Sequence, residues 1–205
     1  MRHKVISSAG SRSATLWFLG WGFDEAVEPY LAISSDAVLL WDYSNLDLDV
    51  DLSQWDSFTV KAWSMGVWAA DAFAAAHPYL HITHRTAFCG TPRPADPSLG
   101  IGAEAIRLTI DNWCDANRGK FARKIAGTSS LAPTVASLMQ GRAIVSQADE
   151  LTHILEAQNV PPAPAAWDVA VIGLRDRIFP PDNQRRWWAQ HAHSIEERNT
   201  PHWPF

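Results

Sequence analysis

The residues best suited to chemistry are a serine and its small neighbours, within residues 58–68. Ala62, Ser64 and Gly66 form a small-x-Ser-x-small pattern. The residues before the serine favour a strand, and the alanine-rich run at 69–76 favours a helix. A serine on a sharp strand-to-helix turn holds its hydroxyl exposed above the sheet, and small flanking residues let the two backbones approach closely. The pattern therefore predicts Ser64 as a nucleophile.

A serine hydroxyl needs an adjacent base, and that base needs a third group that fixes its tautomer. Where the serine lies on such a strand-to-helix turn, the catalytic residues follow one another along the chain as serine, then an acid, then histidine. Asp176 follows the strongly apolar segment 167–173, and His202 lies in a proline-bounded aromatic turn at the end of the sequence. His193 also comes late enough and stays open as the alternative base. The order predicts Ser64, Asp176 and His202 as a catalytic set.

Acyl transfer places negative charge on the carbonyl oxygen, so two preset N–H donors are required. The residue after the nucleophile, Met65, supplies one backbone N–H. The apolar run 14–19 ends in Gly20-Trp21-Gly22, a turn at the end of a buried strand, where α/β sheets place their ligand-binding loops. We therefore expect the N–H groups of Trp21 and Met65 to form an oxyanion hole.

The remaining pattern defines the elements that must position these groups. Strands are expected at 14–19, 37–41, 58–63, 86–89 and 167–173, and short helices at 25–31 and 182–189. Between 95 and 160 only helix patterns occur, at 103–113, 121–125, 131–139 and 148–158. This predicts an α/β-hydrolase fold, a mostly parallel central sheet with helices on both faces and a small helical lid inserted between strands. The expected core is 1–94 and 161–205, the lid is 95–160, and the whole is one compact domain.

Composition narrows the function classes. With 205 residues, 47% hydrophobic and 19% charged, the chain reads as a soluble globular domain. The net charge of −5 argues against nucleic acid as a partner, and no stretch reaches the length of a membrane span. Two cysteines make no disulfide framework, which favours a reducing cytoplasm, and we expect Cys89 to be buried and structural. The acidic loop at 45–54 lacks the glycine and closing glutamate of a calcium loop, so no metal is expected.

Basic residues gather in the predicted lid, at Arg107, Arg118, Lys120, Arg123, Lys124 and Arg142. On an acidic protein such a cluster is either a set of solvated helix faces or a docking patch for an acidic partner. The residue pattern alone leaves both interpretations open.

Several motifs together resemble one family, the BioG-type pimeloyl-[acyl-carrier protein] methyl ester esterases of bacterial biotin synthesis. The matching stretches are Gly20-Trp21-Gly22, Asp42-Tyr43, Ala62-Trp63-Ser64-Met65-Gly66-Val67-Trp68, Cys89-Gly90-Thr91-Pro92-Arg93-Pro94, Gly100-Ile101 and His202-Trp203-Pro204-Phe205. The sequence departs from common α/β-hydrolase patterns at Ala62, where glycine is usual, and at Leu19, where many relatives outside this branch carry histidine. Neither change removes a catalytic atom.

The resemblance implies a cofactor-independent serine carboxylesterase that converts pimeloyl-acyl-carrier-protein methyl ester to the free ω-carboxylate and methanol. Its carrier protein is acidic, so Arg118, Arg123 and Lys124 are expected to dock it. Trp63 and Trp68, inside the serine motif, are expected to contact substrate in an aromatic-lined pocket. Two alternatives stay open: a general short-chain esterase or thioesterase with the same triad, and a catalytically silent binding protein of this fold.

Overall fold

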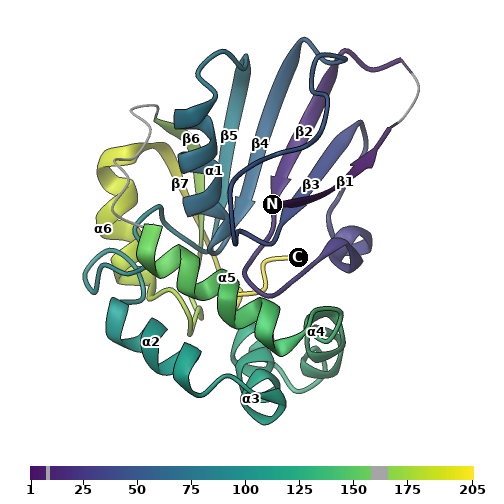
Figure 1. Cartoon of the computed structure of the whole chain (residues 1–205). Coiled ribbons are helices and arrows are strands. Elements are labelled where there is room, and N and C mark those ends of the chain that lie inside the picture. The colour runs from purple at the N-terminus through teal and green to yellow at the C-terminus, as the bar shows by residue number, and fades with distance from the viewer. Residues whose placement is uncertain (8–9, 158–165) are drawn as a thin grey trace.

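The computed structural model describes residues 1–7, 10–157 and 166–205, and its centre is a seven-stranded sheet (Figure 1). The strands are β1 (Arg2–Ile6), β2 (Ser13–Phe18), β3 (Ala37–Trp41), β4 (Ser57–Trp63), β5 (Ile82–Phe88), β6 (Trp167–Gly173) and β7 (Ala192–Arg198). They lie in the order β1-β3-β2-β4-β5-β6-β7. Only the β1–β3 pair is antiparallel among these strands. The predicted mostly parallel sheet is confirmed.

The described helices are η1 (Glu25–Tyr30, a 3-10 helix), α1 (Gly66–Ala76), α2 (Ala103–Asp111), α3 (Asp115–Ala126), α4 (Ala132–Met139), α5 (Ile144–Ala157) and α6 (Pro181–His191). Four of them, α2 to α5, come between β5 and β6, and we call them the cap. Figure 1 shows the cap gathered at one end of the sheet. Both α3 and α5 begin earlier than their patterns predicted. The predicted lid boundary at 160–161, and Gln158, lie outside the described residues.

Two edge strands, β1 and β7, were missed by the sequence patterns. Their side chains are mostly exposed, so no alternation of apolar and polar residues marks them. An edge strand pairs on one side only, and polar or charged side chains there are common. Within the described residues no helix has both the length and the apolar character needed to span a bilayer. The cytoplasmic location stays a prediction.

The core packs on both sides of the sheet next to the serine turn. Phe18 on β2 contacts Phe73 on α1, with ring centroids 5.6 Å apart. Its neighbour Trp17 points to the opposite face, because successive side chains alternate along a strand. There Trp17 stacks on Phe88 and meets Phe205 edge-on, each at 5.7 Å. The last residues of the chain therefore cover this face of the sheet close to its cap end (Figure 1).

Candidate active site

The structure brings the three residues of the predicted catalytic set together. Ser64, Asp176 and His202 follow the ends of β4, β6 and β7, and parallel strands bring these ends to one edge of the sheet. His202 Nε2 lies 2.9 Å from Ser64 Oγ, and His202 Nδ1 lies 2.8 Å from Asp176 Oδ2. All three side chains are buried. The alternative base, His193, is exposed near the start of β7, at the other end of the sheet.

The serine sits on a strained turn with little space around it. Ser64 has a φ of 60°, in the left-handed region, and its N–H donates to Phe88 O at 2.9 Å. A Cβ on Gly66 would lie 2.3 Å from Phe18 O, and one on Gly90 would lie 2.4 Å from Ser64 O. Glycine is therefore required at both positions, and the surrounding backbone holds the serine in a conformation that L-residues rarely adopt.

The Asp176 carboxylate accepts hydrogen bonds on both oxygens. Oδ1 accepts the backbone N–H groups of Ile178 at 2.8 Å and Phe179 at 3.0 Å. Oδ2 accepts from Gln184 Nε2 at 3.2 Å and faces His202 Nδ1. The backbone N–H groups fix which oxygen faces the histidine. Sequence reasoning missed Gln184, because in the sequence it is an ordinary polar residue near the start of a helix.

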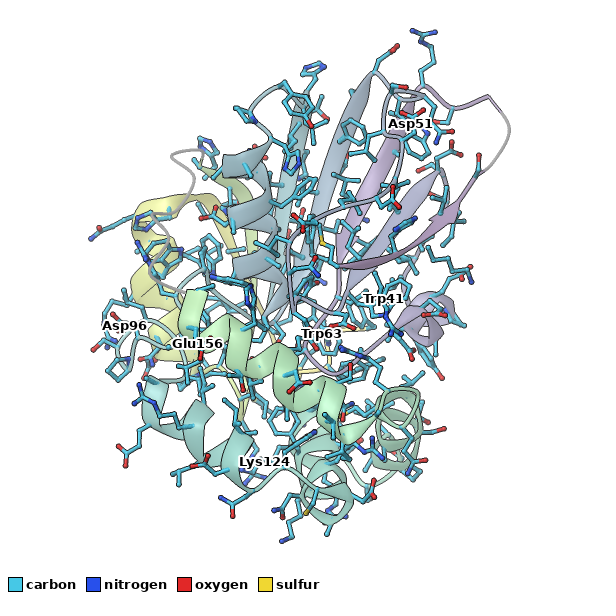
Figure 2. The ribbon with its side chains drawn as sticks, viewed as in Figure 1. Trp41, Asp51, Trp63, Asp96, Lys124 and Glu156 are labelled. Atoms are coloured by element: carbon cyan, nitrogen blue, oxygen red, sulfur yellow. The ribbon has the colours of Figure 1, made fainter. Side chains whose placement is uncertain are left out.

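Aromatic side chains pack around His202 and hold its loop in place. Trp63 Nε1 donates to the backbone carbonyl of His202 at 2.9 Å. The Trp63 ring packs edge-on against Trp203 and Phe205, each at 5.3 Å, and the imidazole stacks on Phe179 with an interplanar angle of 5°. Figure 2 shows Trp63 where the sheet meets the cap. This tryptophan orients the histidine loop and also lines the cavity at Ser64.

A small cavity of about 20 Å³ lies directly at the serine. Its lining includes Ser64, His202, Trp21 and Met65. No described residue accepts a hydrogen bond from the backbone N–H of Trp21 or of Met65. A single water needs about 10–15 Å³ of such space, so the cavity has room for one small group beside the hydroxyl.

A larger groove of about 440 Å³ leads from this cavity over the cap. The walls shared by both spaces are Trp21, Met65, Ile101, Phe121 and Ile178. The outer groove is lined by apolar residues of α2, with two cations, Lys124 and Arg177, at its rim. The arrangement suits an elongated, largely apolar chain whose reacting end reaches Ser64.

The structure places two of the predicted substrate contacts away from both the cavity at Ser64 and the groove. Trp68 is buried on α1 near His153 and lines neither the cavity at Ser64 nor the groove. Arg118 is buried inside the cap, where it donates to Arg142 O at 2.9 Å and pairs with Asp115 at 2.5 Å. The guanidinium is bound by groups inside the cap, so Arg118 is not available to a docking protein.

The other two predicted basic residues, Arg123 and Lys124, are exposed on α3. Figure 2 shows Lys124 in the part of the cap away from the sheet. These two side chains stay candidates for contact with a partner.

A buried ionic cluster joins the cap to the core, and no sequence pattern pointed to it. Glu150 on α5 accepts the backbone N–H groups of Tyr43 at 3.1 Å and Gly22 at 3.4 Å, and it pairs with Arg142. Arg142 also pairs with Asp42 at 3.0 Å. Burial raises the pKa of Glu150 above its ordinary value, and the positive charge of Arg142 opposes that rise.

Replacing Arg142 with methionine is expected to lower the free energy of unfolding by about 3 kcal/mol at neutral pH, because Glu150 loses its buried cation. The pKa of Glu150 then rises further, so the folded protein keeps a proton that the unfolded chain releases. The variant's stability is therefore fully present below the ordinary pKa of a glutamate and is lost as pH rises through the folded value. Urea unfolding at pH 5 and pH 8 measures the effect.

The matched control is the double variant Arg142→Met with Glu150→Gln. It lacks the Glu150 carboxyl, and Asp42 keeps Arg2 as a partner at 3.4 Å, so its loss of stability relative to wild type should change much less between the two pH values than that of the single variant. An equal loss at pH 5 and pH 8 in the single variant would contradict the assignment.

Cys89, directly after β5, is buried as predicted. Burial raises the pKa of its thiol well above the ordinary value, so the thiolate is scarce at neutral pH. In the described part of the chain no group of three or more His, Cys, Asp or Glu side chains could hold a metal ion.

Comparison with known proteins places this chain in a family. A family model described as "Pimeloyl-ACP methyl esterase BioG" matches residues 1–205. A malonyl-[acyl-carrier protein] O-methyltransferase from Bacteroides fragilis (strain 638R) is 33% identical over 195 residues, which are 94% of this chain and 40% of that protein. The chain thus spans less than half the length of this relative.

Comparison with solved structures leads to the same family. The crystal structure of BioG from Haemophilus influenzae matches with a TM-score of 0.84 and 30% identity, covering 98% of this chain and 94% of that chain. The esterase RhEst1 from Rhodococcus sp. ECU1013 matches with a TM-score of 0.68 and 12% identity, over 99% of this chain and 88% of that chain, which shows the shared fold. The chain has the α/β-hydrolase fold and belongs to the BioG family, whose model is described as a pimeloyl-ACP methyl esterase.

Proposed function

We propose that this protein is a serine carboxylesterase that removes the methyl group from pimeloyl-acyl-carrier-protein methyl ester. The observation that carries the proposal is the hydrogen-bonded chain Ser64–His202–Asp176, which lies beside a cavity that adjoins an open groove. The family description names the substrate class. The name of the Bacteroides relative supports an acyl carrier protein as the partner.

In the proposed reaction Ser64 Oγ attacks the ester carbonyl carbon while its proton passes to His202 Nε2. Asp176 holds the imidazole in the tautomer that accepts this proton and stabilises the resulting imidazolium. The N–H groups of Trp21 and Met65 donate to the carbonyl oxygen as it becomes negative. The C–OCH₃ bond then breaks, and His202 gives the proton to the methoxy oxygen, which leaves as methanol.

Water completes the cycle by attacking the acyl-enzyme. His202 takes a proton from the water and returns it to Ser64 Oγ when the C–Oγ bond breaks. The products are the free ω-carboxylate, still linked to its carrier, and the regenerated enzyme. Every step uses side chains and N–H groups of this chain.

The two adjoining spaces support a methyl ester in particular. The cavity of about 20 Å³ beside Ser64 has room for a methyl-sized group, whereas a butoxy group exceeds it. The groove of about 440 Å³ would hold the acyl chain, with its far end pointing out over the cap. A carrier protein outside the groove could then present the chain without entering it.

The test compares the methyl ester of pimeloyl-acyl-carrier protein with the free methyl and butyl esters of pimelate, using purified protein. We expect kcat/KM to be highest for the carrier-linked methyl ester and lowest for the butyl ester. Similar rates for all three would make the protein a general esterase. A protein that turns over none of them, and whose Ser64 does not react with a fluorophosphonate, would be a binding protein instead.

Charge reversal on the cap tests the proposed docking surface. The double variant Arg123→Glu with Lys124→Glu is expected to raise KM for the carrier-linked substrate about tenfold, because it puts negative charge opposite an acidic partner. The increase should shrink at high salt, since exposed charges are screened.

The control is Arg12→Glu, a reversal at an exposed residue just before β2 and outside the groove. It should leave KM within about twofold of wild type, the scale expected for a charge remote from the interface. Equal effects of the cap and control reversals would remove the docking assignment and leave the esterase proposal standing.

A further inference from the structure

Gln147 is a fully buried polar residue on α5, and its side chain makes hydrogen bonds through both ends of the amide. The side-chain nitrogen donates to the carbonyls of Gly22 and Met139, both at 2.8 Å. The side-chain oxygen accepts from the Trp113 indole at 3.1 Å and from Arg118 at 3.4 Å. Two donors and two acceptor sites are all that an amide offers, so its orientation is fixed.

Two contacts of Gln147 fall on the turn that carries Trp21. Its backbone carbonyl accepts the Trp21 indole N–H at 2.7 Å, and its side chain holds the carbonyl of Gly22. A Cβ on Gly22 would lie 3.3 Å from the Gln147 side-chain nitrogen, so the turn and the amide are in close contact. One helical turn further on, Glu150 accepts the Gly22 N–H at 3.4 Å. The cap helix therefore holds this turn through the Trp21 indole and through both backbone groups of Gly22.

We propose that Gln147 is a positioning residue for the oxyanion hole: it holds the turn so that the Trp21 N–H faces the reacting carbonyl oxygen. The inference rests on the proposed function, because it takes Trp21 and Met65 as the two donors. It adds that the cap helix α5 fixes the position of one oxyanion donor and so affects the rate of the chemical step. The Met65 donor is fixed by the core at the serine turn, whereas the Trp21 donor is fixed by a helix of the cap.

This division predicts a particular kinetic defect. An oxyanion donor contributes when it is preset about 2.7–3.1 Å from the charged oxygen, and it contributes little to ground-state binding. Loss of Gln147 leaves Met65 in place and displaces only Trp21. The expected result is a fall in kcat with little change in KM. Because partial unfolding also lowers the apparent kcat, the rate is expressed per active site, counted by phosphonate titration of Ser64.

The first variants are Gln147→Met, which keeps the length but removes all four hydrogen bonds, and Gln147→Glu, which keeps the acceptors and removes the donors to Gly22 and Met139. Both are expected to lower kcat about ten- to a hundredfold, below the 10²–10³-fold typical of deleting a donor. KM should stay within about twofold of wild type. The affinity for a trifluoromethyl ketone, which forms a tetrahedral oxyanion on the serine, should fall in proportion to kcat.

The control is Ile154→Ala, which opens a cavity at a fully buried apolar position of the same helix. It should destabilise the protein and leave kcat of the folded fraction within about twofold of wild type, because it removes no hydrogen bond to the oxyanion turn. If Ile154→Ala lowers kcat as much as Gln147→Met at equal thermal stability, or if Gln147→Met keeps wild-type kcat, the proposal is overturned.

A second measurement does not depend on turnover. In wild-type protein phosphonylated at Ser64, the Trp21 amide should be protected from hydrogen exchange, and this protection should fall in Gln147→Met while that of Met65 stays. Equal protection in both proteins overturns the role of Gln147 and leaves the esterase proposal standing. A wild-type protein that neither hydrolyses the esters nor reacts with the phosphonate overturns both.

Discussion

Replacing Ser64 with alanine is expected to lower kcat for the carrier-linked methyl ester by about 10⁶-fold, the scale seen when a triad nucleophile is removed. Alanine leaves His202 and Asp176 in place but removes the atom that forms the acyl-enzyme. Serine and alanine both carry a Cβ, so at the φ of 60° the substitution adds no backbone strain. Steady-state rates and loss of fluorophosphonate labelling measure the effect.

The matched control is Ser57→Ala, the same substitution at the start of the same strand, at the far end of the sheet. It should leave kcat within about twofold of wild type, as expected for a residue outside the reacting set. Adding His202→Ala to the Ser64→Ala variant should cost little more, because the two residues act as one unit. Additive losses, or a Ser64→Ala variant that retains a tenth of the activity, would contradict a serine mechanism.

The sequence was most informative where a residue type coincided with the end of a strand. Ser64, Asp176 and His202 each follow an apolar strand or a proline-bounded turn, and parallel strands bring such positions to one edge of the sheet. The chain order then selected one acid and one base. His193 failed as the alternative because it lies on β7, a strand with no apolar pattern to reveal it.

Residues whose environment depends on packing between distant segments could not be predicted. Gln147 and Glu150 lie three positions apart on α5, a spacing that in sequence reads as an ordinary polar helix face. They are buried because α5 packs on the turns after β2 and β3, which are distant in the sequence. Arg118 failed in the same way, since a basic residue in a helix is usually solvated, and here neighbouring carbonyls surround it.

Replacing Asp176 with asparagine is expected to lower kcat by about 10⁴-fold, although the side chain keeps its shape. The reason lies in the two N–H groups of Ile178 and Phe179, which require an acceptor at the Oδ1 position. The amide oxygen of asparagine must take that place. The NH₂ group then falls at Oδ2 and donates to His202 Nδ1.

That hydrogen bond forces the wrong tautomer. With Nδ1 as acceptor, the proton of the neutral imidazole sits on Nε2. Nε2 then donates to Ser64 Oγ and cannot accept the serine proton. Binding is untouched, so KM should stay near wild type while kcat falls. Asp168→Asn, the same change at a partly exposed side chain of β6, is the control and should leave kcat unchanged. A small loss in Asp176→Asn would mean that His202 does not depend on Asp176 for its tautomer, and another group would have to supply it.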